Sequence, residues 1–196
     1  MNEHFPNEQD QLYKRIYGGI GWPGARPGYI CIIGELRQPK EHQFILLDEA
    51  ENFDIESLIA RAAALDLYFK PERWFSGEID KATQKLLTET NKLPEKIPGS
   101  RPIRIIPSRL NSLEDEVFRY VYPKLKRMTG HGGHLDISKG KLLLNYMSLP
   151  QDSEISTIKL GEYPSIECLA YVALELEKSK SDKPLANKCI YNPLKL

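Results

Sequence analysis

Long apolar runs, signal sequences and paired cysteines are all missing from this sequence. No apolar run approaches the ~20 residues that a membrane-spanning helix needs, so we expect no membrane partner. Residues 1–15 are polar and lack an apolar signal core, which predicts a cytoplasmic protein. Cys31, Cys168 and Cys189 are odd in number and widely spaced, which excludes a disulfide framework and a zinc knuckle and predicts reduced thiols.

A net charge is also missing, because the 27 Lys and Arg residues balance the 27 Asp and Glu residues. This balance excludes a globally basic nucleic-acid coat protein, so any contact with nucleic acid must come from a local patch. No Gly-x4-Gly-Lys-Ser/Thr loop occurs, so no ATPase of that type is encoded. The length of 196 residues and the 41% of apolar residues predict one domain with one core, or one domain plus a tail.

Three apolar segments near the N-terminus predict three strands. They span residues 17–22, 29–34 and 44–47, and the first two are separated by the turn-rich residues 23–28. Their connections are too short for a parallel crossover, which needs a dozen or more residues. The chain is therefore predicted to open with an antiparallel three-stranded meander.

Helices and strands alternate after the meander. Asp54 is the predicted N-cap of a helix, a strand follows at 73–76, and a second helix follows at 80–90 with Ala82, Leu86 and Leu87 inward. The predicted remainder is a strand at 103–106, a helix at 112–128 opened by a capping box, a hairpin at 135–147 and a final helix from Pro164. This order predicts an α/β fold: a mixed sheet with helices on both faces.

The predicted domain boundaries follow from this organisation. Residues 1–15 are interpreted as a lead-in, 16–178 as the domain, with the hairpin 135–147 as an insertion, and 179–196 as a polar tail.

The succession of elements resembles the RNase H-like fold, and more narrowly the nuclease domain of the phage terminase large subunit. The resemblance covers residues 16–178 and is carried by five pieces: Gly19-Ile20-Gly21-Trp22-Pro23-Gly24 leading into strand 29–35, residues 44–49, residues 74–90, residues 112–137 and Ile166-Glu167-Cys168-Leu169-Ala170-Tyr171. It implies DNA packaging in a phage or prophage, in the cytoplasm of a bacterial host. The implied partners are DNA and a separate packaging ATPase or portal protein.

The resemblance also implies two-metal phosphodiester hydrolysis with Mg²⁺ or Mn²⁺. The family places one acid at the end of the first strand, one after the fourth strand and one at the last helix. Glu78 or Asp80 matches the second position, and Glu167 matches the third. The first position is Trp22, whose indole cannot ligate a cation, and residues 11–34 contain no acid at all.

Two hypotheses of function stay open, beside the alternative that the chain is an unrelated α/β protein, because the order of the meander does not exclude it. The first is a metal-dependent DNA nuclease, and the second is the same fold without catalysis, serving as a DNA-binding or protein-docking module. Each candidate acid also has a structural interpretation: Asp80 is a favoured helix N-cap, Glu78 fits a solvated loop, and Glu167 suits the positive end of a helix dipole.

The basic residues gather in two segments of the sequence. The candidates for binding nucleic acid are Arg101, Arg104, Arg109, Lys124, Lys126 and Arg127. The alternative is that they stabilise a helix C-terminus and solubilise a loop.

Two further groups have a functional and a structural interpretation. Trp22 and Trp74 are candidate stacking platforms for bases, with core packing as the alternative. His131, His134 and Asp136 are a candidate zinc or iron site, with an exposed loop as the alternative.

Overall fold

A six-stranded mixed sheet forms the centre of the protein. The computed structural model describes residues 12–39, 41–91, 101–107, 116–148 and 162–181. The strands lie in the order β5-β4-β1-β2-β3-β6 across the sheet. Their bounds are Tyr13–Gly21 for β1, Gly28–Leu36 for β2, Phe44–Asn52 for β3, Arg73–Ser76 for β4, Ile105–Pro107 for β5 and Leu135–Asp136 for β6.

The strand directions confirm the predicted meander and the fold class. β1, β2 and β3 pair antiparallel, whereas β4 runs parallel to β1 and β5 runs parallel to β4. The order β3-β2-β1-β4-β5 with these directions is the RNase H-like arrangement, and β6 adds a parallel strand beside β3. The protein therefore has an RNase H-like mixed α/β fold.

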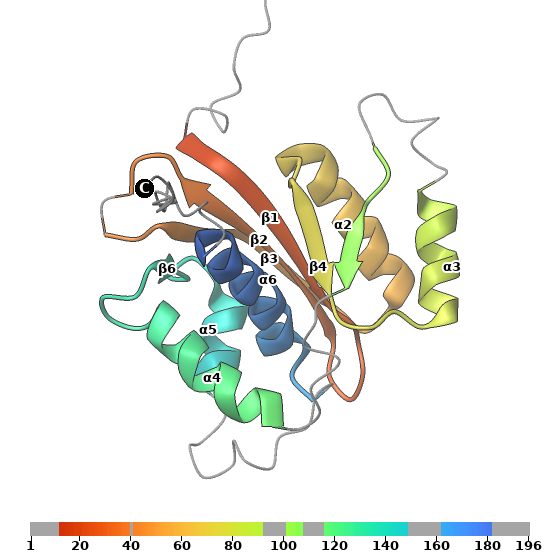
Figure 1. Cartoon of the computed structure of the whole chain (residues 1–196). Coiled ribbons are helices and arrows are strands. Elements are labelled where there is room, and N and C mark those ends of the chain that lie inside the picture. Colours follow the sequence, from red (N-terminus) through yellow and green to blue (C-terminus); the bar gives the residue numbers. More distant parts are fainter. Residues whose placement is uncertain (1–11, 40, 92–100, 108–115, 149–161, 182–196) are drawn as a thin grey trace, which may run out of the picture.

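Helices cover both faces of this sheet (Figure 1). The helices α2 (Ile55–Phe69) and α3 (Lys81–Thr90) lie on one face, which we call the α2 face. The helices α4 (Glu116–Thr129), α5 (Lys141–Ser148) and α6 (Pro164–Ser181) lie on the other face, which we call the α6 face. No helix among the described residues is long and apolar enough to cross a membrane.

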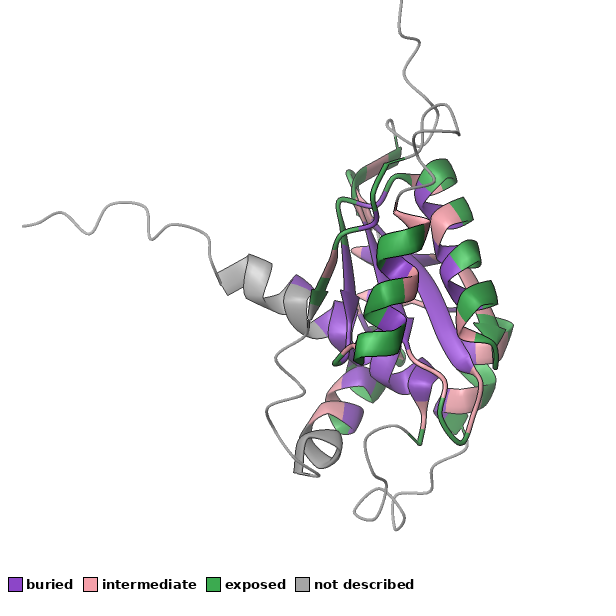
Figure 2. Cartoon of the chain, turned by 90° about the vertical axis from the view of Figure 1, so that its right-hand side faces the viewer, coloured by how far each residue is buried: buried purple, intermediate pink, exposed green. Residues whose placement is uncertain are grey.

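Each face of the sheet has its own apolar core. Ile20, Ile30 and Trp74 pack with residues of α2 on one face, and Tyr29 and Phe44 pack with residues of α4, α5 and α6 on the other. Figure 2 shows the strands buried between helices whose outward sides are exposed. This two-sided burial explains why the residues of β2 form a nearly continuous apolar run in the sequence.

The last helix is buried all round at its N-terminal half. The sequence predicts one inward side, but every residue from Pro164 to Ala173 is buried. The reason is that α6 lies against β1 and β2 and is itself covered by α4 and α5. The helix also runs to Ser181, past the predicted boundary at 178.

Two strands are longer than predicted because polar residues take part in them. β1 begins at Tyr13, inside the predicted lead-in, where Lys14 forms an ion pair with Glu35 of the neighbouring strand. β3 continues through Asp48 and Glu49, and Asp48 forms an ion pair with Arg61 of α2. Cross-strand and helix partners thus keep these charged residues in the sheet.

The predicted hairpin at 135–147 is wrong. The segment forms the short strand β6, parallel to β3, and then helix α5. The carboxylate of Glu49 accepts hydrogen bonds from the backbone N–H groups of Leu142 and Leu143, at 2.8 and 3.0 Å. Because these N–H groups have no partner inside the helix, the carboxylate of β3 stabilises the start of α5.

The other elements differ from prediction in detail. Asp54 caps α2 as predicted, by accepting from the N–H of Ser57. In α3, Leu87 is buried as predicted and Leu86 is half-buried, but Thr83 is buried in place of Ala82, which is exposed. The predicted capping box at 112–115 lies outside the described residues.

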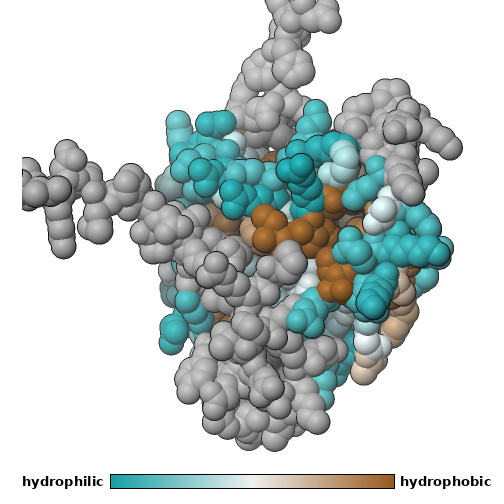
Figure 3. Space-filling model, turned by 45° about the vertical axis from the view of Figure 1, so that its right-hand side comes forward, coloured by the Kyte–Doolittle hydropathy of each residue, from teal (hydrophilic) through white to brown (hydrophobic). Residues whose placement is uncertain are grey.

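Strand β5 forms one edge of the sheet, and it ends at Pro107 rather than at residue 106. An edge position tolerates a proline, which cannot donate a hydrogen bond to a further strand. Figure 3 shows an apolar area among polar residues on the side that this view brings forward. Ile106 of β5 is 40% exposed.

Candidate functional site

The ends of β1 and β4 and the beginning of α6 meet at one end of the sheet. β1 and β4 are parallel, and Ile20 pairs with Ser76 near the end of both strands. The first residue of α6, Pro164, lies directly against Gly21 of β1. The segments that carry Trp22, Glu78 and Glu167 therefore converge at the same end, as the predicted site requires.

The α6 face of β1 has room for glycine alone at this end. A Cβ atom at Gly19 would lie 2.6 Å from Cγ2 of Val172 and 2.8 Å from Sγ of Cys168, which is closer than real contacts allow. A Cβ atom at Gly21 would collide with the carbonyl oxygen of Pro164. The helix thus occupies the space into which an acidic side chain of β1 would have to project to reach α6.

Trp22, the sequence-based match to the first acid position, lies on the opposite side of the sheet from α6. Ile20 belongs to the core of the α2 face, and Trp22 packs against that same core. A carboxylate that meets Glu167 of α6 must come from the other face, where β1 presents Gly19 and Gly21. On the face of β1 that meets α6, both of these positions are therefore glycine.

Glu167 lies in the first turn of α6 and is 6% exposed. Its carboxylate accepts a hydrogen bond from the hydroxyl of Tyr171 at 3.3 Å. Burial, together with the charge of Glu167, raises the pKa of Tyr171 well above its usual range. Glu167 is therefore buried at the end of the sheet where β1 and β4 finish, which is the end that the predicted site requires.

The two candidate acids after β4, Glu78 and Asp80, differ in their surroundings. Asp80 caps α3, with its carboxylate accepting from the N–H of Thr83 at 2.7 Å. Hydrogen bonds from Thr83 lower the pKa of Asp80. Glu78 is exposed in the loop between β4 and α3. The capping interpretation of Asp80 is confirmed, and α3 belongs to the α2 face.

The described residues do not fit a pair of Mg²⁺ or Mn²⁺ ions. Two such ions need several carboxylates that converge from different elements. In the described part of the chain, no three His, Cys, Asp or Glu side chains are grouped closely enough to hold a metal ion. At this end of the sheet, β1 has glycines on the face that meets α6, and the carboxylate of Asp80 is engaged in capping α3.

Of the candidate zinc or iron site at His131, His134 and Asp136, the last two residues have structural contacts. The ring of His134 packs edge-on against Phe44 at 5.9 Å between centroids, and the backbone of His134 accepts hydrogen bonds from Gln43 and Phe44. Asp136 accepts from the N–H of Ser138, and that hydrogen bond lowers the pKa of Asp136. His131 is exposed. This arrangement joins β6 to β3.

Arg101 is part of a network around the buried carboxylate of Asp66, which the sequence did not reveal. Its guanidinium donates to Asp66 of α2 at 2.9 and 3.1 Å and to the carbonyl of Pro71. Asp66 also accepts from the indole N–H of Trp74 at 2.8 Å. Trp74 is 1% exposed, so it is a core residue rather than a stacking platform.

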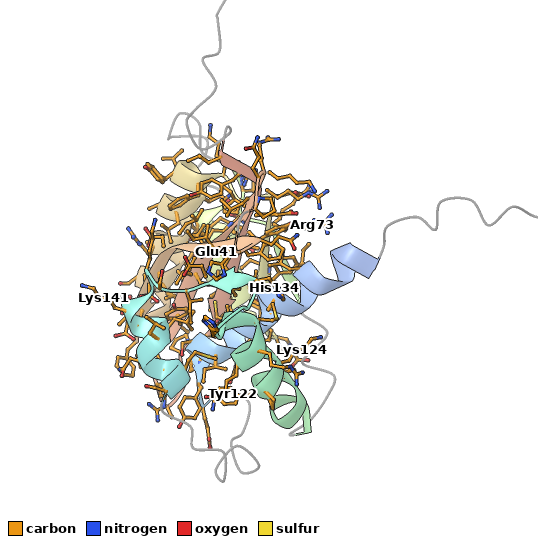
Figure 4. The ribbon with its side chains drawn as sticks, turned by 90° about the vertical axis from the view of Figure 1, so that its left-hand side faces the viewer. Glu41, Arg73, Tyr122, Lys124, His134 and Lys141 are labelled. Atoms are coloured by element: carbon orange, nitrogen blue, oxygen red, sulfur yellow. The ribbon has the colours of Figure 1, made fainter. Side chains whose placement is uncertain are left out.

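The other candidate basic residues lie in two separate places. Arg104 is exposed and precedes Ile105, whose partner in β4 is Trp74, so it lies beside Arg73. Lys126 and Arg127 are exposed in the last turn of α4, and Lys124 is half-buried. Figure 4 shows Arg73 and Lys124 well apart. Arg109 lies outside the described residues.

One cation does lie at the candidate site. The guanidinium of Arg26, in the turn between β1 and β2, stacks on the ring of Tyr163 at 4.3 Å and donates to its hydroxyl at 3.3 Å. Tyr163 immediately precedes α6. The two residues are 137 positions apart, so no pattern in the sequence indicates this contact.

Comparisons with known proteins return only distant structural similarity. No protein-family model and no curated protein matches the chain. A fowlpox virus Holliday junction resolvase matches with a TM-score of 0.42 and 10% identity, over 84% of this chain and 99% of the other. RuvC of Thermus thermophilus matches with 0.38 and 13%, over 83% and 96%. The yeast mitochondrial Holliday junction resolvase Ydc2 matches with 0.42 and 8%, over 87% and 88%.

Proposed function

We propose that this protein is an RNase H-like module that binds DNA. Among the residues that the structure describes, it lacks the arrangement of acids needed for two-metal cleavage, and it does not cut the DNA that it binds. The observation that carries the proposal is the contact of Gly19 and Gly21 with α6 at the end of β1. An acid on that face of β1 would bridge two ions in an active member of the fold. Here α6 takes its place.

Local positive charge supports DNA as the partner. Lys126 and Arg127 are exposed side by side at the C-terminus of α4, and Arg104 is exposed beside Arg73. In a chain of zero net charge, such local clusters are the surfaces that can neutralise phosphates. Arg101 is left out of this surface because it belongs to the Asp66 network.

The first experiment is a DNA-binding titration across salt concentrations with matched variants. The double variant Lys126→Ala/Arg127→Ala should bind roughly tenfold more weakly at low salt, with a salt slope shallower by roughly 1 to 2. The control, Lys81→Ala/Lys85→Ala, also removes two exposed charges from a helix, but from α3 on the α2 face. Equal effects of both variants, or a wild-type slope near zero, would contradict the proposal and favour protein docking.

A metal-dependent nuclease is the second candidate, and Glu167 is the observation that favours it. This acid is buried in the first turn of α6, at the end of the sheet where β1 and β4 finish. Glu78 and Asp80 would complete the set with Mg²⁺ or Mn²⁺ only after they moved towards it. The role in phage DNA packaging, with a packaging ATPase or portal protein as partner, stays a prediction.

Nicking of supercoiled plasmid in the presence of Mn²⁺ decides between the two candidates. The module is expected to leave the plasmid intact. Nicking by the wild type that is lost in Glu167→Gln would establish the nuclease instead. The variant Glu162→Gln, which removes an exposed acid just before α6, serves as the control for charge.

A further inference from the structure

Two thiols meet in the core between the sheet and α6. Cys31 lies in β2 and Cys168 lies in α6, 137 positions further along the chain. Their Sγ atoms are 3.3 Å apart, and both side chains have no exposed surface. They are separate thiols in this structure.

A glycine creates the space in which these thiols meet. Gly19 of β1 pairs directly with Cys31 of β2. A Cβ atom at Gly19 would lie 2.8 Å from Sγ of Cys168. The missing side chain therefore lets the Cys168 thiol reach the sheet beside Cys31.

We propose that Cys31 and Cys168 form a reversible disulfide that fastens α6 to β2 when the protein meets a two-electron oxidant. The two thiols lose two protons and two electrons, and one S–S bond forms. A diazene oxidant such as diamide takes up both protons and both electrons and becomes a hydrazine. A dithiol reductant restores the thiols.

The two thiols are already close to each other in the folded protein, so the bond needs no rearrangement of the fold. A disulfide has an S–S length of about 2.05 Å, so the two sulfur atoms, which lie 3.3 Å apart, must approach by roughly 1.3 Å. Burial raises the pKa of the Cys168 thiol, so the reactive thiolate is scarce and oxidation is slow. The bond would fix the turn that also carries Glu167.

Peptide mapping of the full-length protein tests the proposal. The folded chain is treated with diamide, alkylated with N-ethylmaleimide, digested and analysed by mass spectrometry. An intramolecular Cys31–Cys168 peptide is expected in the wild type and in Cys189→Ser, and not in Cys168→Ala. The proposal would be overturned if Cys31 and Cys168 were both found alkylated after the reaction with diamide was complete. It would also be overturned if the only disulfides found involved Cys189.

Thermal unfolding provides a second readout that needs no variant. A cross-link over such a long loop restricts the unfolded chain, so the oxidised protein should melt at least about 5 °C higher than the reduced one. Dithiothreitol should reverse the shift. An unchanged or lower melting temperature in the cross-linked protein would contradict the claim that the native packing accepts the bond.

Discussion

Single residues decide what the end of the sheet can do. Gly21 faces α6 and touches the backbone of Pro164, so its missing side chain sets how closely the helix approaches β1. Backbone cannot move aside as easily as the end of a flexible side chain. The position is therefore a packing position before it is a candidate for chemistry.

The variant Gly21→Ala should lower the free energy of unfolding by about 2–3 kcal/mol, because the added methyl group overpacks the contact between β1 and the backbone of α6. Gly132→Ala is a useful comparison, since nothing lies within 4 Å of its Cβ position and only its φ of 75° opposes alanine. That variant should cost about 1 kcal/mol. Urea denaturation measures both, and an equal loss for the two would contradict the steric account.

Arg101 shows how a candidate DNA contact becomes a structural residue once the fold is known. Its guanidinium lies against Asp66, which is 3% exposed and also holds Trp74. The Arg101 side chain is 46% exposed, so its removal leaves the buried Asp66 carboxylate with the Trp74 indole as its remaining donor among these two.

Arg101→Ala should therefore destabilise the protein by about 1–2 kcal/mol, because Asp66 loses a charged hydrogen-bond donor that is itself partly screened by solvent, and it should leave the affinity for DNA unchanged. The exposed neighbour Arg104→Ala should change stability by no more than about 0.5 kcal/mol. Denaturant midpoints and DNA titrations on the same samples separate the two roles. A loss of DNA affinity in folded Arg101→Ala would restore the sequence-based assignment.

At the scale of elements, local signals in the sequence predicted most of the fold, and long-range contacts account for the differences. β4 and the caps at Asp54 and Asp80 depend on neighbouring residues, and they agree with prediction. Helix α5 depends on a carboxylate of β3 for its first turn, so its own 8 residues did not distinguish it from a hairpin.

The candidate site was predictable only in its position. The order of elements placed the ends of β1, β4 and α6 together, which is where they lie. The face to which Trp22 belongs depends on the strand register and on how closely α6 packs, and no short segment contains that information. The contact of Arg26 with Tyr163 could not be predicted from the sequence for the same reason.

The variant Glu49→Ala should lower stability by about 2 kcal/mol, because it removes the acceptor for the first N–H groups of α5 and for the hydroxyl of Tyr29. Glu51→Ala is the matched control, since Glu51 lies two residues further on and accepts an exposed hydrogen bond from the hydroxyl of Tyr146. It should cost less than about 1 kcal/mol. Circular dichroism and urea titration test both, and a larger loss for Glu51→Ala would refute the capping role.

At the scale of the whole molecule, alkaline pH should open the α6 face first. Tyr29 and Tyr171 are buried there, and burial is the main cause that raises the pKa of each far above the unfolded value of about 10. A raised pKa means that the protonated hydroxyl is favoured in the folded state. The contribution of each protonated hydroxyl to the free energy of unfolding is therefore complete below about pH 10, and it is lost as the pH rises above that value.

The free energy of unfolding should fall by about 1 kcal/mol per pH unit for each of these tyrosines between pH 10 and 11. Tyr171→Phe should show a shallower decline, because one titrating group is absent. Urea denaturation at several alkaline pH values measures the slopes. Identical slopes in the wild type and the variant would contradict this assignment.

The contact between α6 and the glycines of β1 is the central feature of the proposed non-cleaving module, and a crystal structure determined with Mn²⁺ and DNA tests it most directly. We predict that Pro164 stays against Gly21 and that no ion joins Glu167 to the ends of β1 and β4. Two anomalous scattering peaks about 4 Å apart, held by Glu167 and by Glu78 or Asp80, would contradict the account and establish a metal-dependent nuclease.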